Sequence, residues 1–119
     1  MQDLIKSIKA LSDETRLRIL YLLLERECCV CEVMQVLGIS QTRASRNLSA
    51  LHDAGFLRMR KEGLWSLYSI NKDDTEGYHS ALLEAMRKAL KDNKLLENDR
   101  ERLRKAKRVG PGCVIRNRK

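Results

Sequence analysis

The sequence has no long hydrophobic run, because its longest uninterrupted apolar stretch, Ile19 to Leu24, is far too short to span a bilayer. No apolar segment of the kind that forms a secretory signal follows the first residues. Internal repeats and low-complexity linkers are also missing. We therefore predict a cytoplasmic protein that does not contact a membrane. Its four cysteines should stay reduced in that compartment, which favours metal or redox chemistry over structural disulfides.

Size and charge limit the class of protein further. The chain has 119 residues, so it can bury one modest core but not two. Chains of this size often gain stability by dimerising, since a small domain buries a smaller share of its surface. Lys and Arg outnumber Asp and Glu by 24 to 16, which gives a net charge of +8. This excess favours a polyanionic partner, either nucleic acid or an anionic membrane.

The spacing of apolar residues predicts a mainly α-helical chain with one small β-hairpin. Four helices are expected first: about the first ten residues, the apolar stretch capped by Ser12-Asp13, residues 30–37 with Gly38 as the stop, and the segment from Ser40 to near Gly55. Strands 56–61 and 64–70 should then flank a two-residue loop, Glu62-Gly63. A last long helix, capped by Asp73, Asp74 and Thr75, is expected to reach about Lys107, ahead of the break at Gly110-Pro111-Gly112.

This order of elements predicts a winged helix-turn-helix, in which Gly38-Ile39-Ser40 is the tight turn. We assign residues 1–92 to a DNA-binding and dimerisation domain and residues 93–119 to a basic C-terminal tail that carries Cys113. Because the motif uses the middle helices, the first and last helices are left to form a homodimer. The side chains expected to need a partner there are Ile5, Ile8, Leu82, Leu83, Met86 and Leu90.

The fourth helix has a polar face without acidic residues, as a helix that enters the major groove of DNA requires. Its candidate ligands for double-stranded operator DNA are Gln41, Thr42, Arg43, Ser45 and Arg46. Gln can pair with adenine and Arg with guanine through two hydrogen bonds. The hairpin adds positive charge at Arg58, Arg60 and Lys61 that could hold phosphate. Arg60 and Lys61 complete the predicted DNA-binding set.

Four stretches of the chain resemble the arsenical-resistance repressor family, also called ArsR/SmtB. They are residues 11–20 (LSDETRLRIL), 27–33 (ECCVCEV), 41–48 (QTRASRNL) and 60–65 (RKEGLW). The second is similar to the family's Glu-Leu-Cys-Val-Cys-Asp-Leu metal box. The resemblance implies an operator-binding dimer that represses metal or metalloid resistance genes and is released by its ligand. It implies As(III) as the inducer, with Sb(III) or another thiophilic ion as alternatives, and no organic cofactor.

The chain departs from the family pattern in two places. Met34 stands where arsenite-responsive members often have a third cysteine, and Asn47 stands where His is commoner. Other members bind zinc through paired His and acidic residues on the last helix. Only His52 and His79 are present here, so that site cannot be rebuilt. We predict that both histidines are surface or packing residues.

Three cysteines within four residues, Cys28, Cys29 and Cys31, provide soft ligands that discriminate against magnesium and calcium. On a regular helix Cys29 and Cys31 would point to nearly opposite sides, whereas Cys28 and Cys31 would share a face. Cys29 and Cys31 could then share one ion only if the helix start unwound. Binding through them is therefore expected to distort the third helix and so release DNA. The third sulfur stays open between Cys28 and Cys113.

Three other functions fit parts of this pattern. A thiol redox-sensing transcriptional regulator of the same fold would use the same cysteines without a metal. A small thiol reductase usually has its Cys-x-x-Cys motif near a βαβ unit, and the absence of a parallel-strand pattern argues against an enzyme. A constitutive architectural DNA-binding protein would carry inert, buried cysteines.

Overall fold

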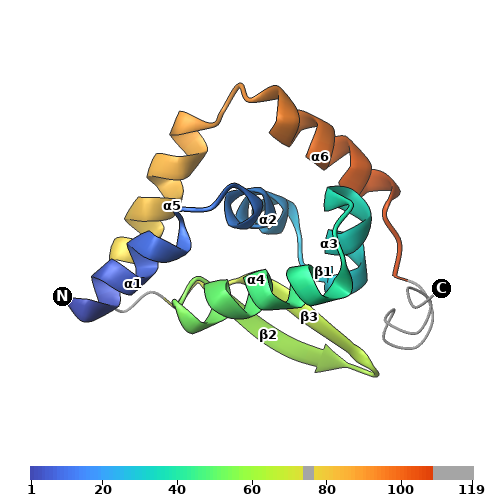
Figure 1. Ribbon diagram of the computed structural model, residues 1–119, viewed down its shortest axis with the longest axis horizontal. Coiled ribbons are helices and arrows are strands. Elements are labelled where there is room, and N and C mark those ends of the chain that lie inside the picture. The colour runs from blue at the N-terminus through green and yellow to red at the C-terminus, as the bar shows by residue number, and fades with distance from the viewer. Residues whose placement is uncertain (74–76, 109–119) are drawn as a thin grey trace.

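The structure is a computed structural model that describes residues 1–73 and 77–108. Its helices are α1 (Gln2–Ala10), α2 (Glu14–Glu25), α3 (Val30–Leu37), α4 (Gln41–Asp53), α5 (Tyr78–Ala89) and α6 (Lys94–Lys105), and its strands are β1 (Cys28–Cys29), β2 (Leu57–Glu62) and β3 (Trp65–Ile70). Figure 1 shows α2 near the centre, α1 and α5 on one side, and α3 and α6 on the other. Helices α3 and α4 form the helix-turn-helix, and the β2–β3 hairpin is the wing. The predicted fold class is confirmed.

Local capping sets the ends of the central helices. The Asp13 carboxylate accepts a hydrogen bond from the backbone N–H of Arg16 (3.0 Å) at the start of α2. The Ser40 hydroxyl accepts one from the backbone N–H of Arg43 (3.1 Å) at the start of α4. Gly38 ends α3 with a φ of 66°, in the left-handed region that glycine adopts without strain. The helix boundaries predicted at these residues are confirmed.

The wing turns one residue later than predicted. Glu62 pairs with Trp65, so Gly63 and Leu64 form the loop in place of Glu62-Gly63. Gly63 has a φ of 60°, and the first position of a tight hairpin loop is one that requires such a positive φ.

Strand β1 was not predicted. Cys28 pairs with Tyr68 and Cys29 with Leu67 of β3, which gives the sheet order β1-β3-β2. Two residues are too few to show an alternating pattern, and their partners lie far along the chain. The sheet therefore joins the cysteine segment directly to the wing.

The C-terminal part of the chain forms two helices where one was predicted. Helix α5 begins after Gly77, which makes no side-chain cap, so the predicted cap at Asp73 is wrong. The other two predicted capping residues, 74 and 75, lie outside the described residues. Helix α6 starts anew at Asn93, whose side chain accepts a hydrogen bond from the backbone N–H of Leu96 (3.2 Å). The helix expected to reach Lys107 is thus interrupted between α5 and α6.

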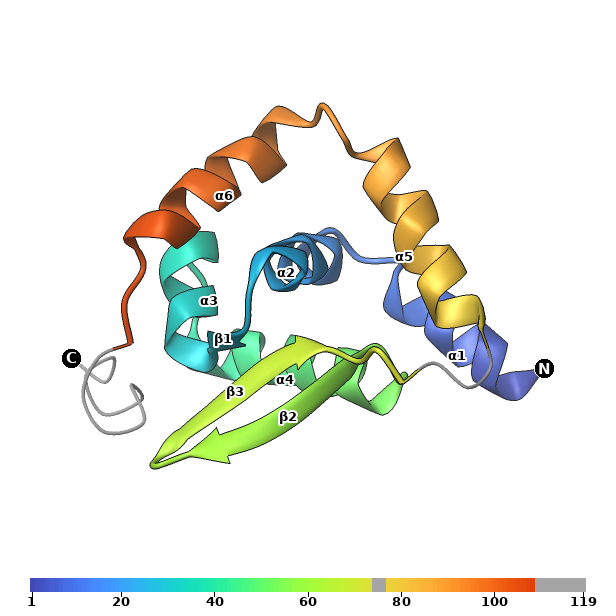
Figure 2. The ribbon, with the colours of Figure 1, turned by 180° about the vertical axis from the view of Figure 1, so that it is seen from behind.

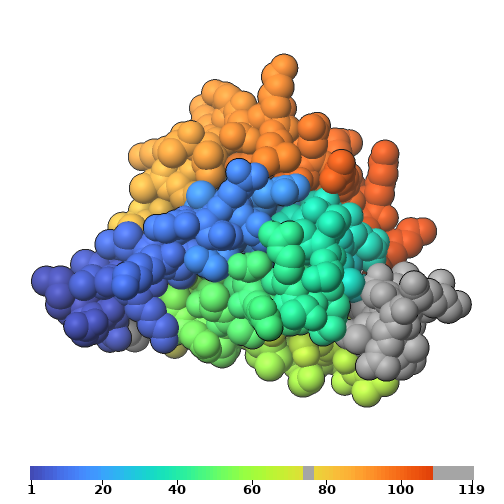
Figure 3. Space-filling view, viewed as in Figure 1, coloured from blue at the N-terminus to red at the C-terminus, as the bar shows by residue number. Residues whose placement is uncertain are grey.

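Helix α6 packs across α2 and α3, and Figure 3 shows its atoms, in orange to red, against those of α3. Leu96 and Leu103 are buried on its inner face. Asp99, only 1% exposed, accepts two hydrogen bonds from the Arg18 guanidinium of α2 (2.8 and 2.9 Å). Such a bidentate pair fixes orientation as well as position. The segment predicted as a basic tail therefore begins as a helix anchored on the domain.

The main core also uses residues that were expected at a dimer interface. Leu83 and Met86 on α5 are each 7% exposed and pack in the core of their own protomer. The expectation that they need a partner is therefore wrong. Ile5 and Ile8 on α1 are 38% and 46% exposed, so they are available to a second subunit. Within residues 1–73 and 77–108, no helix is long and apolar enough to cross a membrane.

Candidate sulfur site and DNA-facing surface

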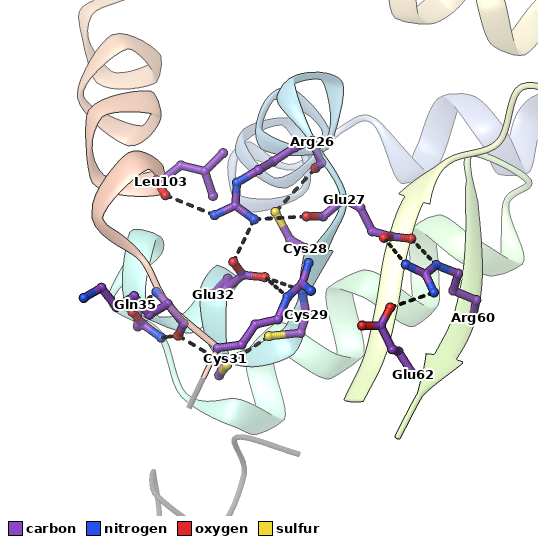
Figure 4. Close-up of polar contacts among 12 residues, drawn as sticks. Arg26, Glu27, Cys28, Cys29, Cys31, Glu32, Gln35, Arg60, Glu62 and Leu103 are labelled. Carbon is purple, nitrogen blue, oxygen red and sulfur yellow. Dashed lines mark hydrogen bonds and ion pairs between the residues drawn. The ribbon is translucent and has the colours of Figure 1, made fainter. Parts of the chain in front are cut away.

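The sulfur atoms of Cys29 and Cys31 are 2.9 Å apart at the start of α3, as Figure 4 shows. Cys29 is the N-cap of α3 and has an extended backbone (φ −91°, ψ 169°), whereas Cys31 lies in the first turn. The expectation that these side chains diverge is wrong, because it placed both residues in the helix. The two sulfurs meet without any unwinding of α3. The Cys31 sulfur is part of a disulfide in this structure, so the expectation that all four cysteines are reduced is wrong for Cys31.

Cys28 points away from this pair. Successive side chains of a strand lie on opposite faces, and Cys28 precedes Cys29 in β1. The Cys28 thiol donates to the carbonyl oxygen of Arg26 (3.5 Å) and packs in the main core. Cys29 and Cys31 belong to a separate small cluster. The expectation that Cys28 and Cys31 share a face is therefore also wrong.

Burial disfavours the thiolate at both residues of β1. It raises the pKa of Cys28 to about 12, and the nearby charge of Glu32 acts in the same direction. Burial also raises the pKa of Cys29. Because the thiolate is the form that binds metals, an ion captured here must displace protons.

Glu32 holds together the segments around the cysteines (Figure 4). Its carboxylate accepts a hydrogen bond from the backbone N–H of Cys29 (2.9 Å) and pairs with Arg26 (2.7 Å) and Arg108 (3.2 Å). Burial alone would raise the pKa of this carboxyl, but the three donors outweigh it and lower that pKa. Glu32 thereby connects the start of α3, the end of α2 and the chain that leaves α6.

The sulfur pair packs against the wing. Its apolar neighbours are Leu67 and Trp65, both on β3. The indole N–H of Trp65 is buried and has no hydrogen-bond partner among the described residues. Together with the β1–β3 pairing, these contacts couple the position of the two sulfurs to strand β3.

A second link joins the cysteine segment to the wing. Arg60 on β2 donates to both carboxylate oxygens of Glu27 (2.8 and 2.7 Å) and pairs with Glu62 (2.9 Å). The two carboxylates raise the pKa of Arg60, and Arg60 lowers that of Glu27. Arg60, predicted to bind DNA, is therefore engaged within its own protomer. The sequence offered no signal for this pair, because its partners are distant in the chain.

The other wing cations also have partners. Lys61 donates to the Ser66 hydroxyl (2.9 Å), and Arg58 pairs with Asp73 (3.5 Å). The side chains of Arg58, Lys61 and Asp73 are exposed, and Ser66 is half-buried. Exposed pairs contribute little to stability, so a phosphate group can replace the carboxylate or hydroxyl at small cost.

The predicted DNA-binding residues of α4 lie along one face. Thr42, Arg43 and Arg46 are exposed, while Gln41 and Ser45 are half-buried. The Gln41 amide donates to the Ser45 hydroxyl (3.3 Å). The opposite face of α4 is buried in the core. This arrangement is suited to a helix that lays its outer face in a DNA groove.

Arg16 positions α4, a role that the sequence did not indicate. Its guanidinium donates to the carbonyl oxygen of Ala10 (2.7 Å) and to the Asn47 side chain (3.2 Å). Asn47 in turn donates to the carbonyl oxygen of Arg43 (2.9 Å). This chain of contacts fixes the recognition helix relative to α1.

The two histidines are a packing residue and a surface residue, as predicted. His79 packs edge-on against Phe56, and its Nε2 is 2.8 Å from the carbonyl oxygen of Ala54. His52 is exposed. In the described part of the chain, no group of three or more His, Cys, Asp or Glu residues could hold a metal ion. Cys113 lies outside the described residues.

A helix-turn-helix with an exposed cationic reading face and a β-hairpin wing defines a winged-helix transcriptional regulator. Residues 13–58 match the family model described as bacterial regulatory protein, arsR family. The chain belongs to this arsR family, whose members are transcriptional regulators and not enzymes.

Relatives and solved structures agree with this assignment. The chain is 41% identical over 91 residues to the arsenic resistance transcriptional regulator ArsR2 of Pseudomonas putida. The matched segment covers 73% of this chain and 79% of that protein. It is also 43% identical over 72 residues to a cadmium resistance transcriptional regulatory protein CadC homolog of Staphylococcus aureus. This match covers 60% of the present chain and only 60% of the length of that relative. The fold is similar to a homodimeric winged helix-turn-helix DNA-binding domain from Mycobacterium bovis, described as a possible ArsR-family regulator. That match has a TM-score of 0.66 and 29% identity, and covers 77% of this chain and 82% of that one.

Proposed function

We propose that this protein is a cytoplasmic, homodimeric repressor that binds operator DNA and releases it when As(III), or a similar thiophilic ion such as Sb(III), binds its cysteine thiolates. The observation that carries the proposal is the Cys29–Cys31 sulfur pair, 2.9 Å apart and packed against the wing. Once the disulfide of Cys31 is reduced, these two neighbouring sulfurs provide a soft ligand pair. The names of the arsenic and cadmium resistance relatives support a soft inducer.

Cys113 supplies the third sulfur in this proposal. Cys28 would have to leave the main core and cross to the opposite face of β1. By contrast, the carbonyl oxygen of Lys107 lies 3.9 Å from the Cys31 sulfur. Six residues of extended chain span roughly 20 Å, so Cys113 is within reach of the pair.

In this proposal, movement of the wing couples ion binding to the release of DNA. Two sulfurs that each lie about 2.3 Å from one ion, with an angle of roughly 90° or more between the bonds, would be at least ~3.3 Å apart, which is wider than the 2.9 Å seen here. Binding must therefore push Cys29 and Cys31 apart. Cys29 is paired with Leu67 of β3, so this movement displaces the wing. A ligand lowers DNA affinity only if it favours the displaced conformation, which is what this geometry supplies.

Arsenite release of a fluorescent operator duplex tests the proposal. The duplex is selected by the reduced protein from a random-sequence pool, and anisotropy is followed as arsenite is added. Cys29→Ser and Cys31→Ser should bind the duplex as the wild type does but stay bound with arsenite. Cys113→Ser should lose the response, whereas Cys28→Ser should keep it.

The same assay separates the alternatives. Release by Cd(II) but not by arsenite would change the inducer, and release by a disulfide-forming oxidant alone would indicate the redox regulator. If Cys29→Ser and Cys31→Ser both release DNA at the wild-type arsenite concentration, the sensing site lies elsewhere and the proposal fails.

A further inference from the structure

The positive charge of this chain is concentrated at its C-terminal end. Residues 93–119 contain ten Lys and Arg against three Asp and Glu, whereas residues 1–92 contain 14 against 13. The winged-helix part is thus almost neutral. Because affinity for DNA depends on cations that neutralise phosphates, the C-terminal segment carries most of the net positive charge that can serve this purpose.

The structure fixes where this segment leaves the domain. The Gln35 side chain on α3 donates to the carbonyl oxygen of Lys107 (2.7 Å) and accepts from its backbone N–H (3.1 Å). The next residue, Arg108, pairs with Glu32 (3.2 Å). Figures 1 and 2 both show the chain running from the end of α6 along α3 toward the level of the wing. The exit is therefore on the wing side of the molecule, away from the α5–α6 corner.

Electrostatic contacts agree with this placement. Burial opposes the charge of Arg108, but Glu32 and, less strongly, Glu62 at the end of β2 raise its pKa. Lys105 and Lys107 beside it are exposed. Neither ammonium group forms an ion pair within the described part of the chain.

A lysine in the last turn of a helix complements the helix dipole, which accounts for Lys105 alone. Lys107 and Arg108 follow the end of α6, where the dipole gives no reason for them. The sequence then adds Arg116, Arg118 and Lys119 without a further acidic residue. The run of cationic residues therefore continues past those that can stabilise the dipole of α6.

We propose that Lys105, at the end of α6, and Lys107, which follows α6, form a second DNA-contacting element. It binds phosphates on the outer side of the wing, next to the bases that α4 faces. Contacts of this kind add affinity and salt dependence but carry no sequence information. The inference rests on the proposed function only in requiring that the protein binds DNA.

The test compares two full-length double variants of equal charge. Lys105→Gln with Lys107→Gln removes two cations at the exit, and Lys88→Gln with Lys91→Gln removes two exposed cations near the α5–α6 corner. Binding to a fluorescent 40-base-pair duplex of mixed sequence is measured over a range of salt concentrations, without arsenite. Circular dichroism checks that both variants are folded.

In the exit variant, the slope of log K against log[salt] should become shallower by up to about 1.8 for each protomer bound, or ~0.9 for each phosphate contact removed. The slope of the corner variant should change far less. Equal slopes for the two variants would overturn this inference while leaving arsenite-dependent release untouched. A wild-type protein that binds no DNA would overturn both proposals. If arsenite fails to release DNA while the salt slopes of the exit and corner variants differ as expected, only the sensing mechanism is overturned.

Discussion

The Arg60 guanidinium on the wing and the Glu27 carboxylate, two residues before Cys29, form a bidentate ion pair with N–O distances of 2.8 and 2.7 Å. Strand β1 pairs with the other strand of the wing. Both wing strands are therefore attached to the segment that holds the sulfur pair. A single residue of that segment cannot move far without moving the wing.

Replacing Glu27 by Gln should free Arg60 to bind a phosphate. One additional phosphate contact per protomer should steepen the slope of log K against log[salt] by about 0.9 for each protomer bound. The matched control is Glu25→Gln, because Glu25 pairs with Arg100 on α6 (2.9 Å) and its loss changes the net charge equally. Anisotropy titrations at several salt concentrations measure both. The same slope in the two variants would show that Arg60 does not exchange Glu27 for DNA.

Arg43 and Arg46 should be needed for operator affinity. Replacing either with Ala should weaken binding by roughly 1–3 kcal/mol if the side chain contacts a base, or reduce the salt slope if it contacts only phosphate. Both side chains are exposed on α4, so the thermal unfolding midpoint should stay near that of the wild type. Lys88→Ala on α5 is the control for the loss of one exposed cation. Wild-type affinity and salt slope in both arginine variants would refute the assignment of α4 as the reading helix.

Trp65 should report ion binding directly. It is the single tryptophan of the chain and packs against the Cys29–Cys31 cluster, so separation of the two sulfurs should change its emission. Arsenite added to the reduced protein without DNA should give a saturable change. Cys29→Ser should abolish that change and Cys28→Ser, whose thiol lies in the main core, should retain it. If Cys28→Ser abolished the change in emission and Cys29→Ser retained it, the ion would instead bind on the other face of β1.

Dimerisation should depend on α1 and not on the buried residues of α5. Ile5→Glu combined with Ile8→Glu should give a folded monomer that binds DNA weakly, since both side chains are substantially exposed in the protomer. Sedimentation measures the association state. Leu83→Ala is the contrast, because it removes a core contact and should cost about 2–5 kcal/mol of protomer stability. An unchanged dimer in the α1 double variant would locate the interface elsewhere.

Gly55 should tolerate substitution less well than Gly38. Both have positive φ, but a Cβ on Gly55 would lie 2.8 Å from the His79 Nε2, whereas a Cβ on Gly38 would meet nothing within 4 Å. Gly38→Ala should cost about 1–2 kcal/mol for the left-handed backbone. Gly55→Ala should cost a further ~1–3 kcal/mol, because His79 is held between Phe56 and the Ala54 carbonyl and cannot easily move. Urea unfolding of both variants gives the difference.

The predictions that held are those that depend on neighbours in the sequence. Asp13 and Ser40 cap their helices through backbone N–H groups three residues ahead, and Gly38 ends α3 through its own φ. The division of α4 into a buried apolar face and an opposite polar face followed from the helical period alone. Each of these features is determined within one or two turns of chain, so residue order was sufficient to find it.

Tertiary structure decided the features that depend on distant partners. Pairing with β3 holds Cys28 and Cys29 in an extended strand, and this turns Cys28 into the core and brings Cys29 to Cys31. The sequence by itself determined the winged helix-turn-helix, the helix ends at Asp13, Gly38 and Ser40, and the presence of soft ligands before α3. Which sulfurs meet was decided by contacts with residues about 40 positions away, because a two-residue segment has no intrinsic preference strong enough to choose strand over helix.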